Sequence, residues 1–353
     1  MGARLIIDIN KIKDNARQIL GECGGAGVSV AAVTKMHRAD RLICEALLEA
    51  GIKILADSRI ENLAKIADIP CEKWLIRIPA LSECERVVDL ADLSLNSEIA
   101  VIRELDKLAG IKGKTHGVLL MFDLGDLREG YFKEEDLLAA AKETLELKNI
   151  RLRGIGTNLS CYGGIKPTFE NLSRLVAIAR RIQKELSVKL DYISGGSSTS
   201  FSLVREGKLP EGINNLRIGD SILIGRDDLT RQYIPSMHSD CFVLECEIVE
   251  IKEKPSVPIG ETGIAALNRL PVFTDKGIRK RAICSVGRQD IDTDMEPLDE
   301  KIELLEASSD HLLADITDCD KEYKIGDRLR FKMKYTSAMR AFTGEYIVRE
   351  YIK

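Results

Sequence analysis

The stretch SVAAVTKMHRAD, Ser29–Asp40, decides the fold class of this chain. A mostly apolar run, Val28–Val33, is typical of a strand buried on both faces, as the strands of a parallel sheet are. Lys35 stands just past the end of this run, after Thr34, and a lysine amine is rarely buried in an apolar core. The stretch therefore predicts a buried strand whose C-terminal end lies in polar surroundings.

Similar short runs alternate with helix-patterned segments over the first two-thirds of the chain. The predicted strands are Ser29–Thr34, Lys53–Asp57, Trp74–Ile78, Asp92–Leu95, His116–Asp123, Arg151–Thr157, Lys189–Ser194 and Asn215–Ile218. The segments between them carry apolar stripes at helical spacing, as in residues 168–186. Eight βα units in about 200 residues predict a TIM-like (β/α)8 barrel, and an open doubly wound sheet is the alternative.

The pattern changes after Asp227. Prolines interrupt short runs of alternating polarity, such as CFVLECEIVEI and DRLRFKMKY, and no long helical stripe follows. This pattern predicts a C-terminal antiparallel β-domain of residues 228–353 after a barrel domain of residues 1–227. The opening residues 1–9, which include ARLIIDI, are expected to pair with the strands of the β-domain.

Composition excludes several classes of function. The net charge of −4 over 353 residues provides no basic field for nucleic acid, and no apolar run reaches the ~20 residues of a membrane helix. The N-terminus lacks a secretory signal pattern. The nine cysteines are scattered singly and only four histidines exist, which argues against a disulfide framework or a metal site. We therefore expect a cytoplasmic protein without a metal.

Polar residues at the C-terminal ends of barrel strands face the active site in barrels of this kind. Lys35 holds such a position, either as an ordinary surface lysine or as a Schiff-base lysine made nucleophilic by partial desolvation. The loops SGGSSTS and RIGDSILIG, after the predicted seventh and eighth strands, combine glycines, hydroxyl groups and helix starts, which suit a phosphate. A lysine and a phosphate cradle together predict a phosphorylated aldehyde cofactor, pyridoxal phosphate.

The order of these motifs resembles one family of pyridoxal-phosphate enzymes. The lysine after strand one, DLGDLREG, SGGSS, RIGDSILIG and a following β-domain are similar to the alanine racemase fold type, fold type III. The alanine/ornithine racemase branch of this family is most similar to the chain in two segments, TKMHRADRLICEALLEAGIKILADSRIENL and ASSDHLLADITD. The resemblance spans residues 5–346. It implies an amino-acid racemase that exchanges the α-proton between two bases through an external aldimine. Ornithine is the favoured substrate, with lysine, other basic amino acids or alanine as further ones.

Carried over position by position, the resemblance implies a set of cofactor-binding residues. Lys35 would bind the cofactor aldehyde, Arg217 would face the pyridine nitrogen, and Arg128 would lie near the phenolic oxygen. Asn158 would pack on the ring, where alanine racemase has a histidine. The phosphate would be held by Ser197, Ser198, Gly219 and the backbone of Asp220, with Tyr335 as a further candidate.

The chain also departs from the family pattern. Ala39 and Met121 stand where a phosphate-binding tyrosine and a carbamylated lysine occur, and Arg288 replaces the partner-chain tyrosine that acts as second base. Lys35 would serve one face of the substrate. The candidates for the other face are His311, Ser309, Asp290 and Cys161, and His311 is preferred because imidazole suits proton transfer near neutral pH.

The segment SSDHLLAD concerns the substrate. It sits where related ornithine decarboxylases carry a partner-subunit Cys-Asp pair, and Asp310, preceded by Ser309, matches the aspartate that binds the distal amine. The simpler interpretation is a turn between strands. The resemblance implies a homodimer in which the β-domain of one chain completes the site of the other. A pyridoxal-phosphate-dependent decarboxylase of a basic amino acid and a non-catalytic protein of pyridoxal phosphate homeostasis are the alternative functions.

Overall fold

The computed structural model describes residues 2–263 and 272–353. They form two compact units, one of residues 10–238 and the other of residues 2–9 with 239–353. Within the described residues, no helix is long and apolar enough to span a membrane. Each unit is described by itself below.

Parallel strands of residues 29–218 close into a barrel in which, within the described residues, eight strands follow one another in chain order. They are β2 (Ser29–Val33), β3 (Ile54–Asp57), β4 (Glu72–Leu75), β5 (Leu93–Asn96), β6 (His116–Met121), β7 (Ile150–Gly156), β8 (Tyr192–Ser194) and β9 (Asn215–Ile218). Because β2 pairs with both β3 and β9, the sheet has no edge, so the predicted barrel is confirmed and the open sheet is wrong. Strand β4 lies earlier than predicted, because its pairing with β3 begins at Glu72 opposite Ile54.

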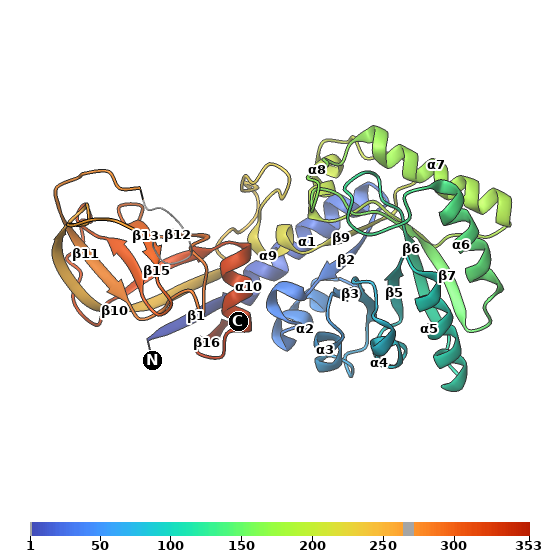
Figure 1. Cartoon of the computed structure of the whole chain (residues 1–353), viewed down its shortest axis with the longest axis horizontal. Coiled ribbons are helices and arrows are strands. Elements are labelled where there is room, and N and C mark those ends of the chain that lie inside the picture. The colour runs from blue at the N-terminus through green and yellow to red at the C-terminus, as the bar shows by residue number, and fades with distance from the viewer. Residues whose placement is uncertain (1, 264–271) are drawn as a thin grey trace. The chain divides into compact units, whose positions relative to one another are not determined.

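Helices cover the outside of this barrel (Figure 1). They are α1 (Ile9–Gly25), α2 (Arg41–Glu49), α3 (Ile60–Lys65), α4 (Cys84–Leu90), α5 (Ile99–Ile111), α6 (Glu134–Glu146), α7 (Phe169–Leu186), α8 (Phe201–Arg205) and α9 (Asp220–Ile224). The longest, α7, begins at a capping box in which Thr168 Oγ1 accepts from the Asn171 N–H and the Asn171 side chain accepts from the Thr168 N–H. Its buried stripe is the one that the sequence predicts.

Alternating strand residues fill the barrel interior. The interior residues are Ala31, Val33, Ile54, Ala56, Trp74, Leu93, Leu95, Leu119 and Met121. Small residues on β2 and β3 leave room for Trp74, whose ring meets Tyr192 edge-on at 4.8 Å between centroids. Because Ala31 and Val33 point inward, the same alternation sends Lys35 toward the barrel mouth.

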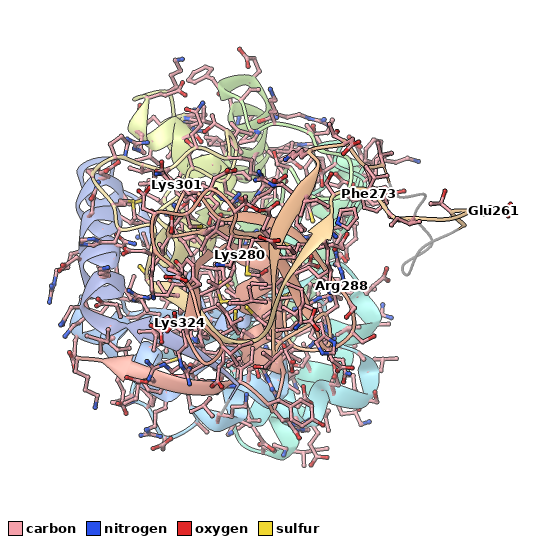
Figure 2. The ribbon with its side chains drawn as sticks, turned by 90° about the vertical axis from the view of Figure 1, so that its left-hand side faces the viewer. Glu261, Phe273, Lys280, Arg288, Lys301 and Lys324 are labelled. Atoms are coloured by element: carbon pink, nitrogen blue, oxygen red, sulfur yellow. The ribbon has the colours of Figure 1, made fainter. Side chains whose placement is uncertain are left out.

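The second unit is an antiparallel β-domain, as predicted. Its strands are β1 (Ala3–Asp8), β10 (Phe242–Pro255), β11 (Ile278–Cys284), β12 (Met295–Pro297), β13 (Glu303–Ala307), β14 (Leu312–Asp315), β15 (Arg328–Met333) and β16 (Val348–Ile352). Strand β1 pairs antiparallel with β10 and parallel with β16. Figure 2 labels Lys280 on β11 and Arg288 in the loop that follows it.

One helix of the β-domain was missed by the sequence pattern. Helix α10 spans Tyr335–Thr343 and buries Ala338, Ala341 and Phe342. Phe342 packs edge-on against Phe242 of β10 at 5.6 Å between centroids. The helix is short and follows β15 after a single residue. Its few apolar residues therefore could not be told apart from the alternating pattern of that strand.

Candidate active site

Lys35 opens a short 3-10 turn, Lys35–His37, directly after β2. Arg38 and Ala39, which end the turn, have φ values of +54° and +50°, and the Arg38 N–H donates to Lys35 O. Left-handed backbone at non-glycine residues carries strain and is often found at functional sites. The turn thus holds the lysine at the C-terminal end of its strand.

The amine of Lys35 lies in a concave mouth. Solvent reaches the side chain, yet the protein atoms around it desolvate the ammonium and so lower the pKa of Lys35 from its ordinary value. The charge of Arg128 lowers that pKa further, whereas Cys161, Asp57 and Asp228 act in the opposite direction. A lowered pKa makes the neutral amine, which is the nucleophile and the base, more available.

Arg217 projects from β9 and is only 4% exposed. Its Nη1 donates to Ser194 Oγ at 2.6 Å and its Nη2 donates to Thr157 O at 2.8 Å. Burial lowers the pKa of Arg217 to about 10. These hydrogen bonds fix the orientation of the guanidinium. Within the described residues, none of its hydrogen-bond acceptors is a carboxylate.

The loops after β8 and β9 are joined by a hydrogen bond between them. The Gly219 N–H donates to Ser198 Oγ at 3.1 Å, and Ser197 Oγ lies 3.2 Å from Thr199 Oγ1. Gly196 has φ +116°, and a Cβ there would come within 2.7 Å of Ser200 Oγ. Close backbone approach and clustered hydroxyl groups are what a bound phosphate needs.

Asp220, which follows Gly219, uses its carboxylate elsewhere. That carboxylate forms a buried ion pair with Arg226 at 3.0 Å. Burial and the nearby charge of Asp228 raise the pKa of Asp220 to about 6. The ion pair occupies Asp220 Oδ2, and the backbone of Asp220 is the part that the sequence analysis expects to hold the phosphate.

Two buried hydroxyl groups at this end of the barrel support a bound group. Thr157 Oγ1, after β7, and Ser221 Oγ, in α9, have no hydrogen-bond partner among the described residues. Buried polar atoms without partners are uncommon and call for an explanation. With a reactive amine, the cation of Arg217 and a hydroxyl-rich loop, the residues fit pyridoxal phosphate.

The loops after β6 and β7 complete the rim of the mouth. Arg128 pairs with Glu129 and donates to Cys161 Sγ at 3.0 Å. The buried carboxylate of Asp126 holds the second loop, because it accepts from the N–H groups of Cys161, Tyr162 and Ile165. Asn158 follows β7 and is half-buried. Asp126 thus has a structural role in the rim.

The predicted residues of the β-domain gather in a separate pocket of about 550 Å³. Its lining residues are Val249, Ser285, Val286, Gln289, Asp290, Asp310, His311 and Tyr346. The lining holds two carboxylates and an imidazole but no lysine or arginine. Asp310 accepts from Gln289 Nε2 at 2.6 Å, and Asp290 Oδ1 is buried without a partner in the described part of the chain. Burial raises the pKa of Asp290, as does the charge of Asp310.

Other predicted β-domain residues have different surroundings. Ser309 is exposed in the turn that contains Asp310, and Tyr335 is the first residue of α10. Arg288 is tied to Glu306 at 2.5 Å and to Asp292 at 3.3 Å. Its guanidinium is therefore occupied by structural ion pairs.

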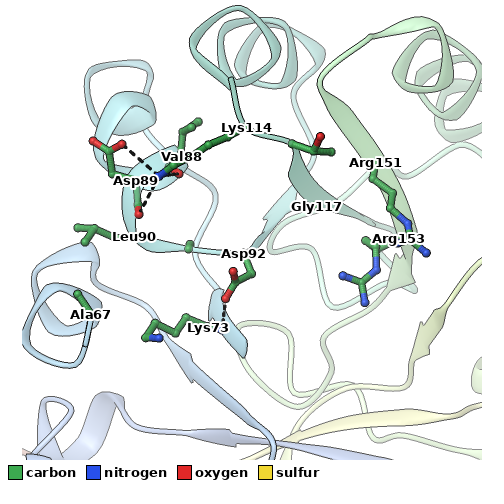
Figure 3. A pocket seen from close by; sticks show the side chains of 12 residues that line it. Ala67, Lys73, Val88, Asp89, Leu90, Asp92, Lys114, Gly117, Arg151 and Arg153 are labelled. Carbon is green, nitrogen blue, oxygen red and sulfur yellow. Dashed lines mark hydrogen bonds and ion pairs between the residues drawn. The ribbon is translucent and has the colours of Figure 1, made fainter. Parts of the chain in front are cut away.

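A further pocket, also of about 550 Å³, lies at the opposite, N-terminal end of the barrel strands (Figure 3). Its basic side chains are paired within the protein: Arg151 and Arg153 bind Asp191, and Lys114 binds Asp89. This end of a barrel serves stability, so the candidate active site is the mouth around Lys35.

Sequence reasoning missed Ser194 and Ser221 as residues of the mouth, and Asp57 as a buried carboxylate behind it. Asp57 ends β3 and is fully buried beside Thr34. The signal that selected Lys35, a polar residue at a strand end, was also present at Asp57 and Ser194. Ser221 lies inside a helix-patterned segment and carries no such signal.

Comparisons with known proteins agree with this geometry. Residues 7–226 match the family described as alanine racemase, N-terminal domain. The chain is 47% identical over 351 residues to the ornithine racemase of Acetoanaerobium sticklandii, covering 99% of both chains. It is 38% identical over 351 residues to the lysine racemase of Thermotoga maritima, covering 99% of this chain and 98% of that one. Its fold is similar to alanine racemase from Bartonella henselae with covalently bound pyridoxal phosphate, with a TM-score of 0.73, 18% identity and full coverage of both chains.

Proposed function

The chain belongs to the alanine racemase family and is a pyridoxal-phosphate-dependent amino-acid racemase, and from this premise we propose that its substrate is ornithine. The observation that carries the proposal is the 47% identity to an ornithine racemase over nearly the whole of both chains. Lysine is the second candidate substrate, because a lysine racemase is 38% identical over the same length. Both amino acids carry a second ammonium group at the end of an apolar stem.

The residues of the mouth would hold the cofactor. When bound, pyridoxal phosphate withdraws electrons from the α-carbon of an amino acid and so makes its C–H bond acidic. Lys35 would bind the aldehyde carbon, Arg217 would face the ring nitrogen, Arg128 the phenolic oxygen and Asn158 the ring. The phosphate would be held by Ser197, Ser198, Gly219, the backbone of Asp220 and Tyr335.

Arg217 would control the ring nitrogen by its charge. With a pKa of about 10, its guanidinium keeps its charge near neutral pH and can only donate hydrogen bonds. A fixed donor beside the ring nitrogen keeps that nitrogen unprotonated. Electron withdrawal is then weaker, which favours prompt return of the α-proton over side reactions.

Racemisation requires proton carriers on both faces of the α-carbon. Lys35 would serve one face, and its lowered pKa supports a role as base at moderate pH. We propose His311 of the partner subunit for the other face. Arg288, at the position of the family tyrosine, is unsuited because it is held by Glu306 and Asp292.

Asp310 would select a diamino acid. Its pocket offers carboxylates for a distal ammonium and apolar contact from Val249 and Val286 for a methylene stem, and Ser309 is the exposed residue before Asp310 in the same turn. Because these residues belong to the β-domain, we propose a homodimer in which the β-domain of one chain completes the mouth of the other. The free cysteines, most of them buried, support a cytoplasmic location.

One experiment tests the reaction and the substrate together. The holoenzyme is incubated in deuterated water with L-ornithine, L-lysine and L-alanine in turn, and both α-deuteration and the D-form are measured. We expect the fastest exchange with ornithine. Release of carbon dioxide without D-ornithine would point to the decarboxylase alternative, and cofactor binding without any exchange would point to the homeostasis alternative.

A mixing experiment tests the shared site. Lys35→Ala and Asp310→Ala chains, each impaired alone, are unfolded and refolded together or co-expressed. Random pairing should restore up to about a quarter of wild-type activity toward ornithine, because half of the dimers are mixed and each has one intact site. No restoration would contradict a site built from two chains.

A further inference from the structure

A buried carboxylate lies directly behind the backbone that carries Lys35. Asp57 and Thr34 are both fully buried, and Thr34 Oγ1 donates to Asp57 Oδ2 at 2.6 Å. The other oxygen, Asp57 Oδ1, accepts from the Arg59 N–H at 2.9 Å and from Asn62 Nδ2 at 3.0 Å. Thr34 immediately precedes Lys35, so this network fixes the backbone at the point where the strand ends and the turn with Lys35 begins.

Strand alternation places the network on the outer side of the barrel wall. Val33 and Ala56 point into the barrel, so their successors Thr34 and Asp57 point toward the covering helices. The ends of β2 and β3 are also joined by their backbones, because the Thr34 N–H donates to Ala56 O at 2.8 Å. Asp57 therefore acts on the mouth from behind and without touching a ligand in it.

Burying the charged form of the Asp57 carboxylate costs free energy. Within the described residues, it forms no ion pair at hydrogen-bond distance. Burial raises the pKa of Asp57, while the donors Thr34, Asn62 and Arg59 N–H act to lower it. The charge of Lys65 also acts to lower the pKa of Asp57, and the Lys65 amine donates to Asn62 Oδ1 and to Arg38 O. A buried carboxylate held mainly by hydrogen bonds calls for a role.

We propose that Asp57, acting through Thr34, is a positioning residue for the racemase reaction that fixes the turn bearing Lys35 and supplies the negative charge behind its amine. The inference rests on the proposed proton-carrying role of Lys35. In that role the amine takes up the α-proton on one face and later returns a proton. The ammonium form lies close to the cation of Arg128, and Asp57 offsets that repulsion.

The test measures the titration of Lys35 itself. The full-length chain is freed of cofactor by dialysis against hydroxylamine, and each lysine is labelled competitively with acetic anhydride across pH and quantified by mass spectrometry. The groups whose charges act on the pKa of the amine are Arg128, Cys161, Asp57 and Asp228. Because Asp57 is the anion removed, Asp57→Asn should lower the pKa of Lys35 by about one unit.

Two further variants separate positioning from folding. Thr34→Ser keeps the hydroxyl and should titrate like wild type. Thr34→Val removes one hydrogen-bond donor to Asp57, which favours the neutral form of the carboxyl group, and should therefore also lower the pKa of Lys35.

A matched control lies in the β-domain. Asp315→Asn removes another buried carboxylate there and should leave the titration of Lys35 unchanged.

The outcomes distinguish this inference from the proposed function. A Lys35 titration within about 0.2 unit of wild type in Asp57→Asn overturns the inference, even if that variant is less stable. If Asp57→Asn fails to fold, Thr34→Val titrating like Thr34→Ser overturns it instead. In the holoenzymes, the pH profile of kcat should move with the Lys35 titration while KM changes less than about threefold. Wild type that exchanges no ornithine α-proton overturns the proposed substrate but leaves the titration result standing.

Discussion

The mouth of the barrel and the pocket of the β-domain satisfy their polar groups in different ways. In the mouth, Arg217 is almost fully buried and held by two hydrogen bonds, and behind the mouth Asp57 accepts three. In the pocket, Asp310 and His311 are exposed, and Asp290 Oδ1 has no partner among the described residues. Both regions thus keep polar groups for a ligand, but the barrel side holds its buried charges in fixed hydrogen bonds, whereas Asp310 and His311 on the β-domain side are exposed.

The two regions also differ in charge. In the mouth, the charge of Arg128 lowers the pKa of both Lys35 and Arg217, and this gathering of basic groups suits an anionic phosphate. The β-domain pocket presents carboxylates and an imidazole, which suit an ammonium group. Under the proposed function, cofactor binding would reside mainly in the barrel and substrate selection in the β-domain, and the following predictions test that division.

The largest expected effect comes from Lys35→Ala. Without the amine, the mouth loses its covalent attachment point and one proton carrier, so racemase activity should fall by more than about 10³-fold. The visible absorbance of the bound cofactor should disappear in the same preparation. Thermal unfolding should change little, and a variant that keeps both absorbance and activity would contradict the assignment of the mouth.

Acid should weaken the barrel through His116, at the start of β6. Burial lowers the pKa of His116 to about 4 from an ordinary value of 6.5, and its Nε2 lies 2.8 Å from Ser94 Oγ. Since the folded pKa is depressed for a base, its contribution is intact above pH 6.5 and is lost as the pH falls toward 4, by up to about 3 kcal/mol. Denaturant unfolding at several pH values should show this loss in wild type, and His116→Gln should flatten the slope between these values.

Gly287→Ala should disturb the β-domain pocket alone. A Cβ at this residue would lie 2.3 Å from Ser309 O and 2.4 Å from Asp310 N, so the turn that presents Asp310 must shift. We expect a loss of about 2 kcal/mol in the free energy of unfolding, together with weaker use of ornithine. Cofactor absorbance serves as the control, and its loss would show that the two regions are not independent.

The smallest effect is expected for Asp310→Asn. Loss of one exposed charge-assisted hydrogen bond should raise KM for ornithine about tenfold, with kcat changed less. KM for alanine, which lacks a distal ammonium, should stay within about twofold. Equal effects on both amino acids would remove Asp310 from substrate selection.

Prediction from the sequence succeeded where the pattern was local. Most barrel strands lie in short runs rich in apolar residues, and Lys35 was found because it stands at the end of such a run, after Thr34. Helix α10 was missed because its apolar spacing is too short to stand out beside β15. The role of Asp57 could not be predicted, since its partners Thr34 and Asn62 come together only when β2, β3 and α3 pack.

The sequence by itself determined the barrel, the β-domain and the position of Lys35 at a strand end, because alternation and apolar runs depend on neighbouring residues. Only the tertiary structure decided which polar groups meet. It joined Ser198 to Gly219, Arg217 to Ser194 and Thr157, and Gln289 to Asp310. Hydrogen bonds between residues far apart in the chain depend on how the elements pack, and a single sequence does not contain that information.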